Sequence, residues 1–443
     1  MPLRTPVHAA LDRVRAWVAR WGSVMPLLAA EFILWTGFGA LLPVMPLYFT
    51  EQGVDLAYLG VVIAAWPAAR LFTEPVFGYI ADRTARVPLM VIGLLLASAS
   101  VGAMVLWATP FAFVALRAAS GLGTAIYDPA ARGYLNDAAP EGRRGEVFGL
   151  YSAAQMGGIL LGPAIGGLGT AMVGSFTFVL QLSAVTTLLA AVAVALRVRE
   201  QPRPEPGGRR TRPDTPGSVM AEFPADLPGS REARPTGAPS PTSLRNRFIA
   251  AAILVNLAGY FGGGLYETIW ALFVVDRGGS VELIGLTFAI FGLVTIILSP
   301  YGGRVVDRRG PFPFIVFGIV VMVAMMASYP FVHEPNLYVA MVALEAVGFA
   351  FLGPATYLVI ARGTPEGRSS TAQGIVGSAG TVGTIVASLV AGFLAATDLS
   401  APFFLGAGVA SVLLLATVLV AGRALLDAAP ARSPVTEASA AAD

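Results

Sequence analysis

Long apolar runs separated by short polar connections are the dominant pattern of this 443-residue chain. A hydrophobic helix of about 20 residues crosses the hydrocarbon core of a bilayer, and roughly twelve runs of that length fit between Val24 and Ala424. We therefore predict an all-α membrane protein with twelve transmembrane helices. The predicted spans are 24–49, 56–81, 88–108, 111–135, 147–170, 174–196, 247–275, 281–303, 312–332, 336–361, 370–396 and 400–423.

The arginines are distributed unevenly between the two sides of the predicted membrane. Connections after the even-numbered spans contain nearly all of the loop arginines, whereas the odd-numbered connections contain only Arg277. Lysine and arginine accumulate in the cytoplasmic loops of membrane proteins. We therefore expect a multi-pass protein of the cell (inner) membrane with both termini in the cytoplasm.

Polar stretches divide the chain into parts. Residues 197–246 are dense in proline, glycine and arginine and lack apolar periodicity, which is typical of a disordered linker. A passive tether is the favoured role, with regulation as the alternative. The N-terminal segment contains arginines and tryptophans, as in an amphipathic helix on the inner surface or a merely basic tail. The expected domains are the N-terminal segment 1–23, a six-helix bundle 24–196, the cytoplasmic linker 197–246, a second six-helix bundle 247–424 and a cytoplasmic tail 425–443.

Composition excludes several kinds of chemistry. With 56% hydrophobic and 13% charged residues the chain is too apolar for a soluble domain, and its net charge of +2 reflects topology, not nucleic-acid binding. All 29 basic residues are arginine and cysteine is absent, which excludes lysine Schiff bases, disulfides and thiolate catalysis. His8 and His333 cannot form a histidine metal site within the membrane. We expect no metal and no other cofactor.

The two halves of the chain are related by an internal repeat. Asp82 and Asp307 lie 225 positions apart, each in a short charged loop that follows an apolar run. The same offset relates several further pairs, which indicates two halves in parallel orientation. These pairs are Gly60 and Gly285, Pro75 and Pro300, Pro129 and Pro354, Gly149 and Gly374, Gly167 and Gly392, and the segments 140–143 and 365–368.

The first charged loop also carries a family resemblance. Its residues Gly78, Asp82, Arg83 and Arg86 resemble the G-x-x-x-D-R-x-x-R loop between helices two and three of the major facilitator superfamily, and the matching loop of the second half contains Asp307 and Arg308. The resemblance implies two parallel six-helix repeats around a central cavity. It also implies that Asp82 holds the outward-facing state through contacts between spans two and eleven, with Arg86 in the same network. Two residues depart from the family's usual pattern: Ala85 stands where glycine is common, and Val87 where a second basic residue is common. They leave open how strongly this contact between spans two and eleven, called the latch below, holds the outward-facing state.

Small residues dominate the fifth predicted span. Gly158, Gly162 and Gly166 lie four apart on one helical face, beside Pro163 and Gly167, and such a face lets another backbone approach closely. Generic packing would explain the glycine spacing alone. With the proline and the paired glycines, the string resembles the fifth-helix signature of drug/proton antiporters. That resemblance implies a pliable contact between the halves, because the family pairs span five with span eight and span two with span eleven.

The fourth predicted span contains Arg117 followed by Gly121 and Gly123, which resembles a second antiporter motif whose arginine is linked to proton transfer. An arginine at bilayer depth costs at least about 2.5–3.5 kcal/mol on insertion scales unless a partner or water receives it. Arg117 therefore needs an acid or a wet cavity. The alternative is that its side chain extends toward the outer surface.

Acidic residues within the spans are the candidates for proton binding. A lone carboxylate in a low-dielectric site takes up a proton more readily than one in water. Glu31 is the strongest candidate, because it lies in span one, a cavity-lining position in this family, four residues before Trp35. Its repeat equivalent is Asn256, which is polar without a titratable proton. The other acids within spans are Glu74, Asp128, Glu267 and Glu345.

Glu267 lies between Tyr266 and Trp270, after a glycine cluster at 262–264 where span seven could bend toward the cavity. An acid with aromatic neighbours suits a lipophilic cation. The alternative is a carboxylate that simply reaches water. Arg70 and Glu74, four apart on one helix, are interpreted as a pair that neutralises itself.

These features together predict a secondary active transporter. The favoured function is proton-coupled efflux of lipophilic or cationic small molecules, with Glu31, Arg117 and Glu267 in proton coupling and Trp35, Asn256, Tyr266 and Trp270 in the substrate cavity. Its expected partners are a small-molecule substrate, protons and the lipid bilayer, and a monomer is expected. An enzyme is not expected, because neither a nucleophile with a base nor clustered metal ligands are visible at membrane depth. A primary pump is not expected, because the sequence has no phosphate loop and no lysine. The alternatives are a transporter of a sugar or another metabolite, or a non-transporting receptor on the same fold.

Overall fold

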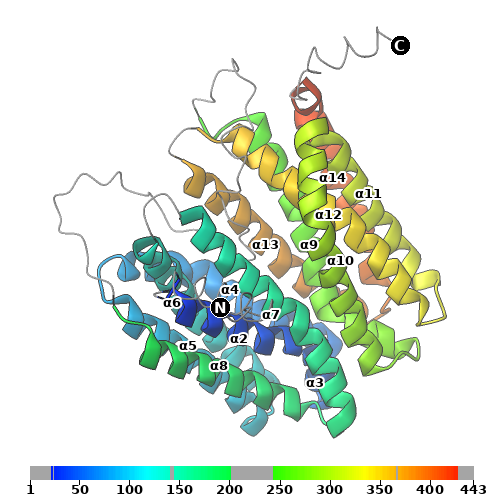
Figure 1. Ribbon diagram of the computed structural model, residues 1–443. Coiled ribbons are helices and arrows are strands. Elements are labelled where there is room, and N and C mark those ends of the chain that lie inside the picture. The colour runs from blue at the N-terminus through cyan, green and yellow to red at the C-terminus, as the bar shows by residue number, and fades with distance from the viewer. Residues whose placement is uncertain (1–20, 23, 140–143, 201–242, 366–367, 428–443) are drawn as a thin grey trace, which may run out of the picture.

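The computed structural model describes residues 21–22, 24–139, 144–200, 243–365 and 368–427. Within these ranges every regular element is a helix (Figure 1). Most of the predicted N-terminal segment, linker and tail, and the repeated segment 140–143 with Glu366 and Gly367, lie outside the described residues. The helices are α2 (Met25–Leu41), α3 (Met45–Glu51), α4 (Leu56–Ala81), α5 (Arg86–Leu106), α6 (Pro110–Ala138), α7 (Arg144–Val173), α8 (Thr177–Arg197), α9 (Arg247–Asp276), α10 (Val281–Arg309), α11 (Phe312–Ser328), the 3-10 helix η1 (Tyr329–Phe331), α12 (Leu337–Gly363), α13 (Ser369–Ala395) and α14 (Ala401–Asp427).

The helices correspond closely to the predicted apolar runs. Ten of the described helices are long and apolar enough to cross a membrane, and α2 with α3 forms an eleventh span if the two are taken together across a 49° bend. The fourth predicted span is α6, which is 29 residues long and less apolar because it carries Arg117, Asp128 and Arg132. An all-helical membrane protein is therefore confirmed.

Short polar side chains define where several of these helices begin. The Asn246 side chain accepts hydrogen bonds from the backbone N–H groups of Phe248 and Ile249 at the start of α9, and Asp55 and Ser280 cap α4 and α10 in the same way. Asn246 also donates to the carbonyl oxygen of Gly363 at the end of α12, at 2.7 Å. One residue therefore fixes both the start of α9 and its position beside α12.

The charged residues of α4 and α6 neutralise one another inside the first half. Arg70 forms an ion pair with Asp128 and lies 3.4 Å from Glu74, which in turn lies 3.4 Å from Arg132. The predicted pairing of Arg70 with Glu74 is therefore one part of a four-residue network. Because the two arginines offset the two carboxylates, this network can remain charged at low dielectric.

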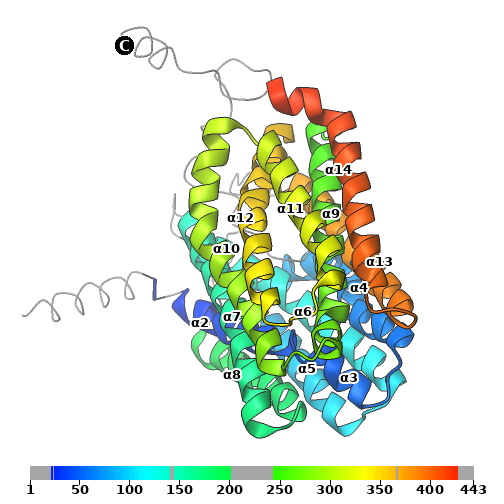
Figure 2. The same cartoon turned by 90° about the vertical axis from the view of Figure 1, so that its right-hand side faces the viewer.

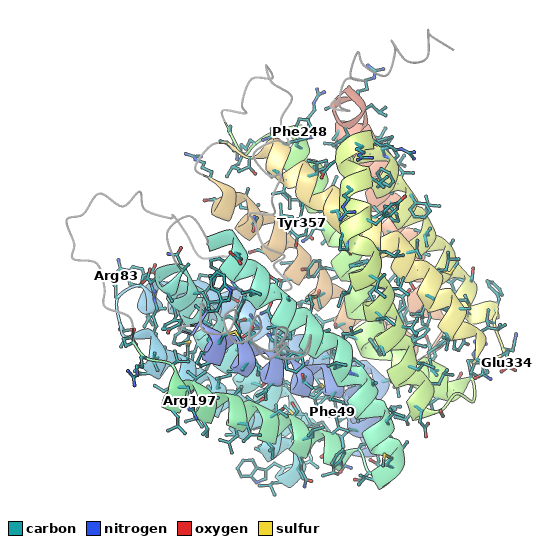
Figure 3. The ribbon with its side chains drawn as sticks, in the orientation of Figure 1. Phe49, Arg83, Arg197, Phe248, Glu334 and Tyr357 are labelled. Atoms are coloured by element: carbon teal, nitrogen blue, oxygen red, sulfur yellow. The ribbon has the colours of Figure 1, made fainter. Side chains whose placement is uncertain are left out.

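Helices α2 to α8 pack on one another, as do α9 to α14, and the two groups lie side by side (Figure 1). Two helix pairs, α4 with α13 and α7 with α10, form most of the contact between the groups, whereas α11 and α14 lie on the side away from the first group (Figures 1 and 2). We call the ends of the two groups that carry Arg197 and Phe248 the linker end (Figure 3). The opposite end, near Phe49 and Glu334, is called the far end.

Four glycines bring the two groups into backbone contact near the far end. A Cβ on Gly392 would lie 2.6 Å from the backbone nitrogen of Gly60, and a Cβ on Gly285 would lie 3.1 Å from the Cα of Gly167. The repeat offset maps the first contact onto the second, so the two contacts are related by the internal symmetry. From this closed region the helix groups diverge toward the linker end (Figure 1).

Candidate functional site

Glu31 lies in the interior of the first group of helices, with none of its surface exposed. Its Oε1 accepts hydrogen bonds from Trp35 Nε1 at 2.8 Å and from Gln155 Nε2 at 2.6 Å, and its Oε2 accepts one from the Tyr127 hydroxyl at 2.5 Å. These donors come from α2, α6 and α7 and are all uncharged. In the described part of the chain, no arginine forms an ion pair with Glu31.

Arg117 and Glu267 meet between the two groups of helices. The Arg117 guanidinium, on α6, lies 3.5 Å from the Glu267 carboxylate, on α9, and the side chains are 3% and 16% exposed. Arg117 also donates to the carbonyl oxygen of Ile63 at 3.5 Å and lies 6.0 Å from the centre of the Trp66 ring. Arg117 therefore has an acidic partner from the opposite half.

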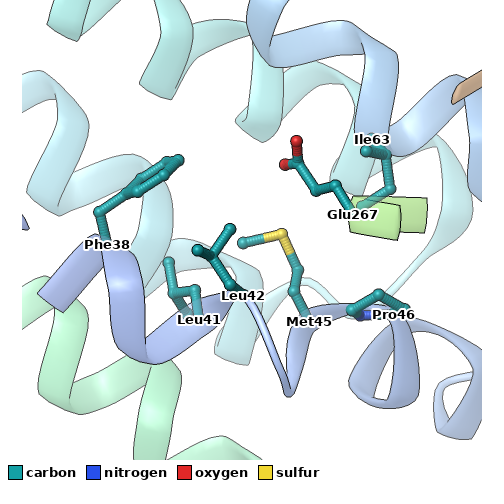
Figure 4. A pocket seen from close by; sticks show the side chains of 7 residues that line it. All are labelled: Phe38, Leu41, Leu42, Met45, Pro46, Ile63 and Glu267. Carbon is teal, nitrogen blue, oxygen red and sulfur yellow. The ribbon is translucent and has the colours of Figure 1, made fainter. Parts of the chain in front are cut away.

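The Glu267 carboxylate borders a small apolar hollow at the break between α2 and α3 (Figure 4). The break spans residues 42–44, where Pro43 follows the end of α2. Because every other lining side chain is apolar, the hollow combines a single acid with a hydrophobic surface. The lining residues are Phe38, Leu41, Leu42, Met45, Pro46, Ile63 and Glu267.

A line of aromatic rings connects the Glu31 network to this hollow. The rings of Trp35 and Phe38 have centroids 5.2 Å apart, and Phe38 is again 5.2 Å from Trp66. The Arg70 guanidinium lies 4.7 Å from the centre of the Trp66 ring. Trp66 is therefore close to two arginines, an arrangement favourable for cation–π attraction. Sequence reasoning did not single out Phe38 or Trp66.

Tyr266 and Trp270, which the sequence analysis places in the substrate cavity, are not among the residues that line the hollow. Trp270 is 3% exposed, donates to Thr287 at 2.9 Å and packs among the rings of the second group. Tyr266 donates to Glu345. Residues four apart share one face of a helix, so Tyr266 and Trp270 point together, whereas Glu267 is rotated by about 100° from Tyr266.

Asn256, the repeat equivalent of Glu31, donates through Nδ2 to the carbonyl oxygen of Val376 at 2.9 Å. A Cβ on Gly380 would lie 2.5 Å from that same nitrogen. Asn256 therefore joins α9 to α13 inside the second group, and this contact gives it a structural role.

The first charged loop is tied to α6 and to the residues that follow α8. Arg86 forms an ion pair with Asp137 at 2.5 Å and donates to the carbonyl oxygen of Gly133. The backbone N–H groups of Arg86 and Val87 donate to the two carboxylate oxygens of Glu200, at 3.0 and 2.9 Å. These contacts hold the start of α5 in place.

Asp82 and Arg83 occupy the exposed part of that loop, and Gly78 precedes them on α4. Arg83 stacks on Tyr79, with 3.4 Å between the guanidinium carbon and the ring centre. Among the described residues no side-chain hydrogen bond or ion pair joins Asp82 to α13. In the matching loop of the second half, Asp307 and Arg308 are exposed on the last turn of α10.

The glycine-rich face of α7 is divided between two partners. Gly158, Gly162 and Gly166 contact the backbone of α2, inside the same half, whereas Gly167 contacts Gly285 of α10. The carbonyl oxygen of Pro163 also faces Gly285, at 2.7 Å from where a Cβ would lie. This differs from the expectation that the whole face borders the other half. Gly167 is the next residue after Gly166, so it points to a different side of the helix.

These observations define a class of protein: a multi-pass helical membrane protein whose two halves meet at a buried arginine–carboxylate pair. The model of the Major Facilitator Superfamily matches residues 27–262 and 252–441. The chain therefore belongs to the Major Facilitator Superfamily. It is a secondary transporter and not an enzyme.

Relatives and solved structures are similar over most of their length. Multidrug resistance protein 1 of Bacillus subtilis (strain 168) is 25% identical over 384 residues, which cover 85% of this chain and 91% of the relative. Quinolone resistance protein NorA of Staphylococcus aureus (strain COL) is 20% identical over 380 residues, with the same coverage of 85% and 91%. A bacterial homolog of the human lysosomal transporter Spinster, in an inward-facing and occupied conformation, superposes with a TM-score of 0.69 at 14% identity over 95% of this chain and 99% of that chain. These similarities establish the fold.

Proposed function

We propose that this transporter exports lipophilic or cationic small molecules in exchange for protons, by alternating access. The names of its relatives, a multidrug resistance protein and a quinolone resistance protein, support this substrate class. The observation that carries the proposal is a carboxylate in an apolar hollow, Glu267, whose ion-pair partner Arg117 belongs to the opposite half.

A lipophilic cation fits this arrangement better than a neutral or an anionic molecule. The hollow is closed to water-sized molecules in this conformation, so it would have to widen to admit a substrate. The charge of the cation would then replace Arg117 at Glu267, and its apolar part would contact Phe38 and Met45. Binding would therefore break an ion pair that joins the two halves. A ligand that binds one conformation more tightly than another shifts the equilibrium between them, so cation binding would be linked to opening.

Glu31 supplies the proton-binding group in this proposal. It is buried among uncharged donors, and a buried charge without a counter-ion is costly. Protonation removes that cost. The rings of Trp35, Phe38 and Trp66 form continuous packing between Glu31 and the Arg117–Glu267 pair, through which a change at one site reaches the other.

The conformation fits an exporter waiting for its substrate. The helix groups are in contact near the far end and diverge toward the linker end. With the linker in the cytoplasm, as the arginine distribution predicts, this is an inward-facing state. The exposed position of Asp82 agrees with a latch that forms only in the outward-facing state. A membrane potential supplies about 2.3 kcal/mol per charge per 100 mV, in addition to the pH gradient.

Transport in proteoliposomes tests the proposal. Purified wild-type protein should move tetraphenylphosphonium and ethidium uphill when a pH gradient is applied. Glu31→Gln should abolish uphill transport while retaining binding, and Glu267→Gln should weaken transport of cations selectively. The matched control is Glu334→Gln, an exposed acid at the far end, which should transport normally. Failure of the wild-type protein to move either cation, or full coupling in both Glu31→Gln and Glu267→Gln, would refute the proposal.

A further inference from the structure

A second buried carboxyl group lies in the other half of the protein, away from the hollow. Glu345 is on α12, about two turns from its start, and is 6% exposed. Its Oε1 accepts a hydrogen bond from the Tyr266 hydroxyl at 2.7 Å, and its Oε2 accepts one from the Tyr329 hydroxyl at 2.8 Å. Each carboxylate oxygen therefore has a phenol donor, one from α9 and one from η1.

In the part of the chain that the structure describes, no arginine forms an ion pair or hydrogen bond with Glu345. The arginine that contacts η1, Arg277, donates to the carbonyl oxygen of Pro330 at 3.0 Å. The titratable groups near it are tyrosines: Tyr266 on α9, Tyr329 on η1 and, one ring further, Tyr338 at the start of its own helix. The nearest side of α10 contributes the Thr287 hydroxyl, which is bonded to Trp270. Helices α11 and α14 contribute apolar groups to the core around these rings, such as Met326 and Phe403. Glu267, the residue after Tyr266 on α9, is paired with Arg117.

This environment differs from that of the other buried acids. Glu74 and Asp128 are each paired with arginine, so they can stay ionised at low dielectric. Glu345 has only neutral donors, and a carboxylate held in that way is much more costly to keep charged. A group that served merely to join α9, η1 and α12 would not need an ionisable carboxyl.

The hydroxyl groups of Tyr266 and Tyr329 can form hydrogen bonds with the Glu345 carboxyl group in both of its protonation states. In the ionised state both tyrosines donate. In the neutral state the carboxyl O–H can donate to one phenol oxygen, whose own hydrogen turns away, while the second phenol still donates to the carbonyl oxygen. Only hydroxyl hydrogens rotate, so no heavy atom has to move. Protonation adds one proton to one carboxylate oxygen and changes the charge of the site from −1 to zero.

We propose that Glu345 is a second proton-binding site, located in the second half, and that it is loaded and unloaded once in each transport cycle. The inference rests on the proposed proton-coupled function. Tyr266 connects the site to the exchange mechanism, because it precedes Glu267 on α9 and so lies on the turn that carries the ion pair between the halves. Each half then contains one proton-binding carboxyl, Glu31 and Glu345. The exchange of one monovalent cation for about two protons would move net charge across the membrane.

Infrared difference spectroscopy of the purified full-length protein, recorded between acidic and alkaline pH, tests protonation without any transport. A buried carboxyl gives a C=O stretching band when it is protonated. We expect such a band to be lost in Glu345→Gln and retained in Glu334→Gln, the exposed acid of the same half. Tyr329→Phe removes one donor to the ionised form, so its band should persist to higher pH, by about one unit if one hydrogen bond changes the equilibrium tenfold.

The stoichiometry of transport provides the second measurement. With tetraphenylphosphonium as the probe, wild-type protein should exchange about two protons per cation and Glu345→Gln about one, as determined at zero membrane potential from the pH gradient that stops net flux down a fixed cation gradient. An unchanged carboxyl band in both Glu345→Gln and Tyr329→Phe would overturn the inference. So would an unchanged stoichiometry. Either result would leave the proposed antiport intact, whereas failure of wild-type uphill transport would refute the antiport and not the protonation of Glu345.

Discussion

Adding one methyl group to Gly392 should weaken the contact that closes the far end. The Cβ of Gly392→Ala would lie 2.6 Å from the backbone nitrogen of Gly60 and 2.7 Å from the carbonyl oxygen of Leu56. Non-bonded heavy atoms rest at about 3.5–4.0 Å, so α4 and α13 must separate by about 1 Å. Overpacking of this kind costs about 1–3 kcal/mol. The strain exists only in the conformation in which the two helix groups touch at the far end. It should therefore change the equilibrium constant between this conformation and the one open at the far end by about 5–150-fold, in favour of the open one.

The repeat-related contact supplies a graded comparison. A Cβ on Gly167 would lie 3.0 Å from the Cα of Gly285. The two helices must therefore separate by a smaller distance than in Gly392→Ala. We therefore expect Gly167→Ala to shift the population in the same direction but to a smaller extent. Gly408→Ala is the matched control, because a Cβ there meets nothing within 4 Å. It gains the same helix propensity, about 1 kcal/mol, without a clash.

Distances between spin labels at the far end measure this shift. The chain contains no cysteine, so cysteines placed at Glu51 and Thr397 can be labelled without removing others. Pulsed electron paramagnetic resonance should show a longer-distance population that grows from wild type to Gly167→Ala to Gly392→Ala. An unchanged distribution in Gly392→Ala, or an equal change in Gly408→Ala, would refute the assignment of these glycines to a contact that opens and closes.

Two further variants test the charged loop and the glycine-rich helix. Asp82→Asn should slow turnover while leaving tetraphenylphosphonium binding unchanged, because the exposed Asp82 lies in a loop far from the hollow; normal turnover would remove its proposed role as a latch. Gly162→Leu should lower the thermal unfolding temperature in detergent, because a Cβ there would lie 2.6 Å from the backbone of Gly39 and Ala40 inside one half. An unfolding temperature equal to that of wild type would contradict this packing.

The fold could be predicted from the sequence because its determinants are local or repeated. Each span is a run of apolar residues long enough to be recognised alone, and the 225-residue offset relates the two halves. The same offset relates Gly60 to Gly285 and Gly167 to Gly392, which the structure brings together in crossed pairs. The repeat pattern of the sequence includes these four glycines. It did not indicate that Gly60 would contact Gly392 or that Gly167 would contact Gly285.

The sequence marked some of the residues of the candidate site but did not indicate their partners. A buried arginine such as Arg117 requires an acidic partner. That this partner is Glu267 depends on how α6 and α9, from different halves, pack together, and the spacing of residues along the sequence does not show it. Glu345 was visible only as an acid within a span, because its phenol partners come from α9 and η1. Trp270 was grouped with Glu267 because the two are close in sequence. Helical geometry places Trp270 with Tyr266 instead.

The broken first span has a mechanical consequence. Tyr48 and Phe49 of α3 pack in the first half, where the Tyr48 hydroxyl donates to Met104, whereas Leu47 of the same short helix is buried in the core of the second half. The boundary between the two moving groups therefore passes along α3, between the first-half core that holds Tyr48 and the second-half core that holds Leu47. When the far end opens, the Leu47 side chain loses its contacts with the core of the second half. This loss costs about 1.5–3 kcal/mol if the side chain becomes fully exposed. That cost sets a minimum for the free energy that substrate or proton binding must supply before the outer pathway opens.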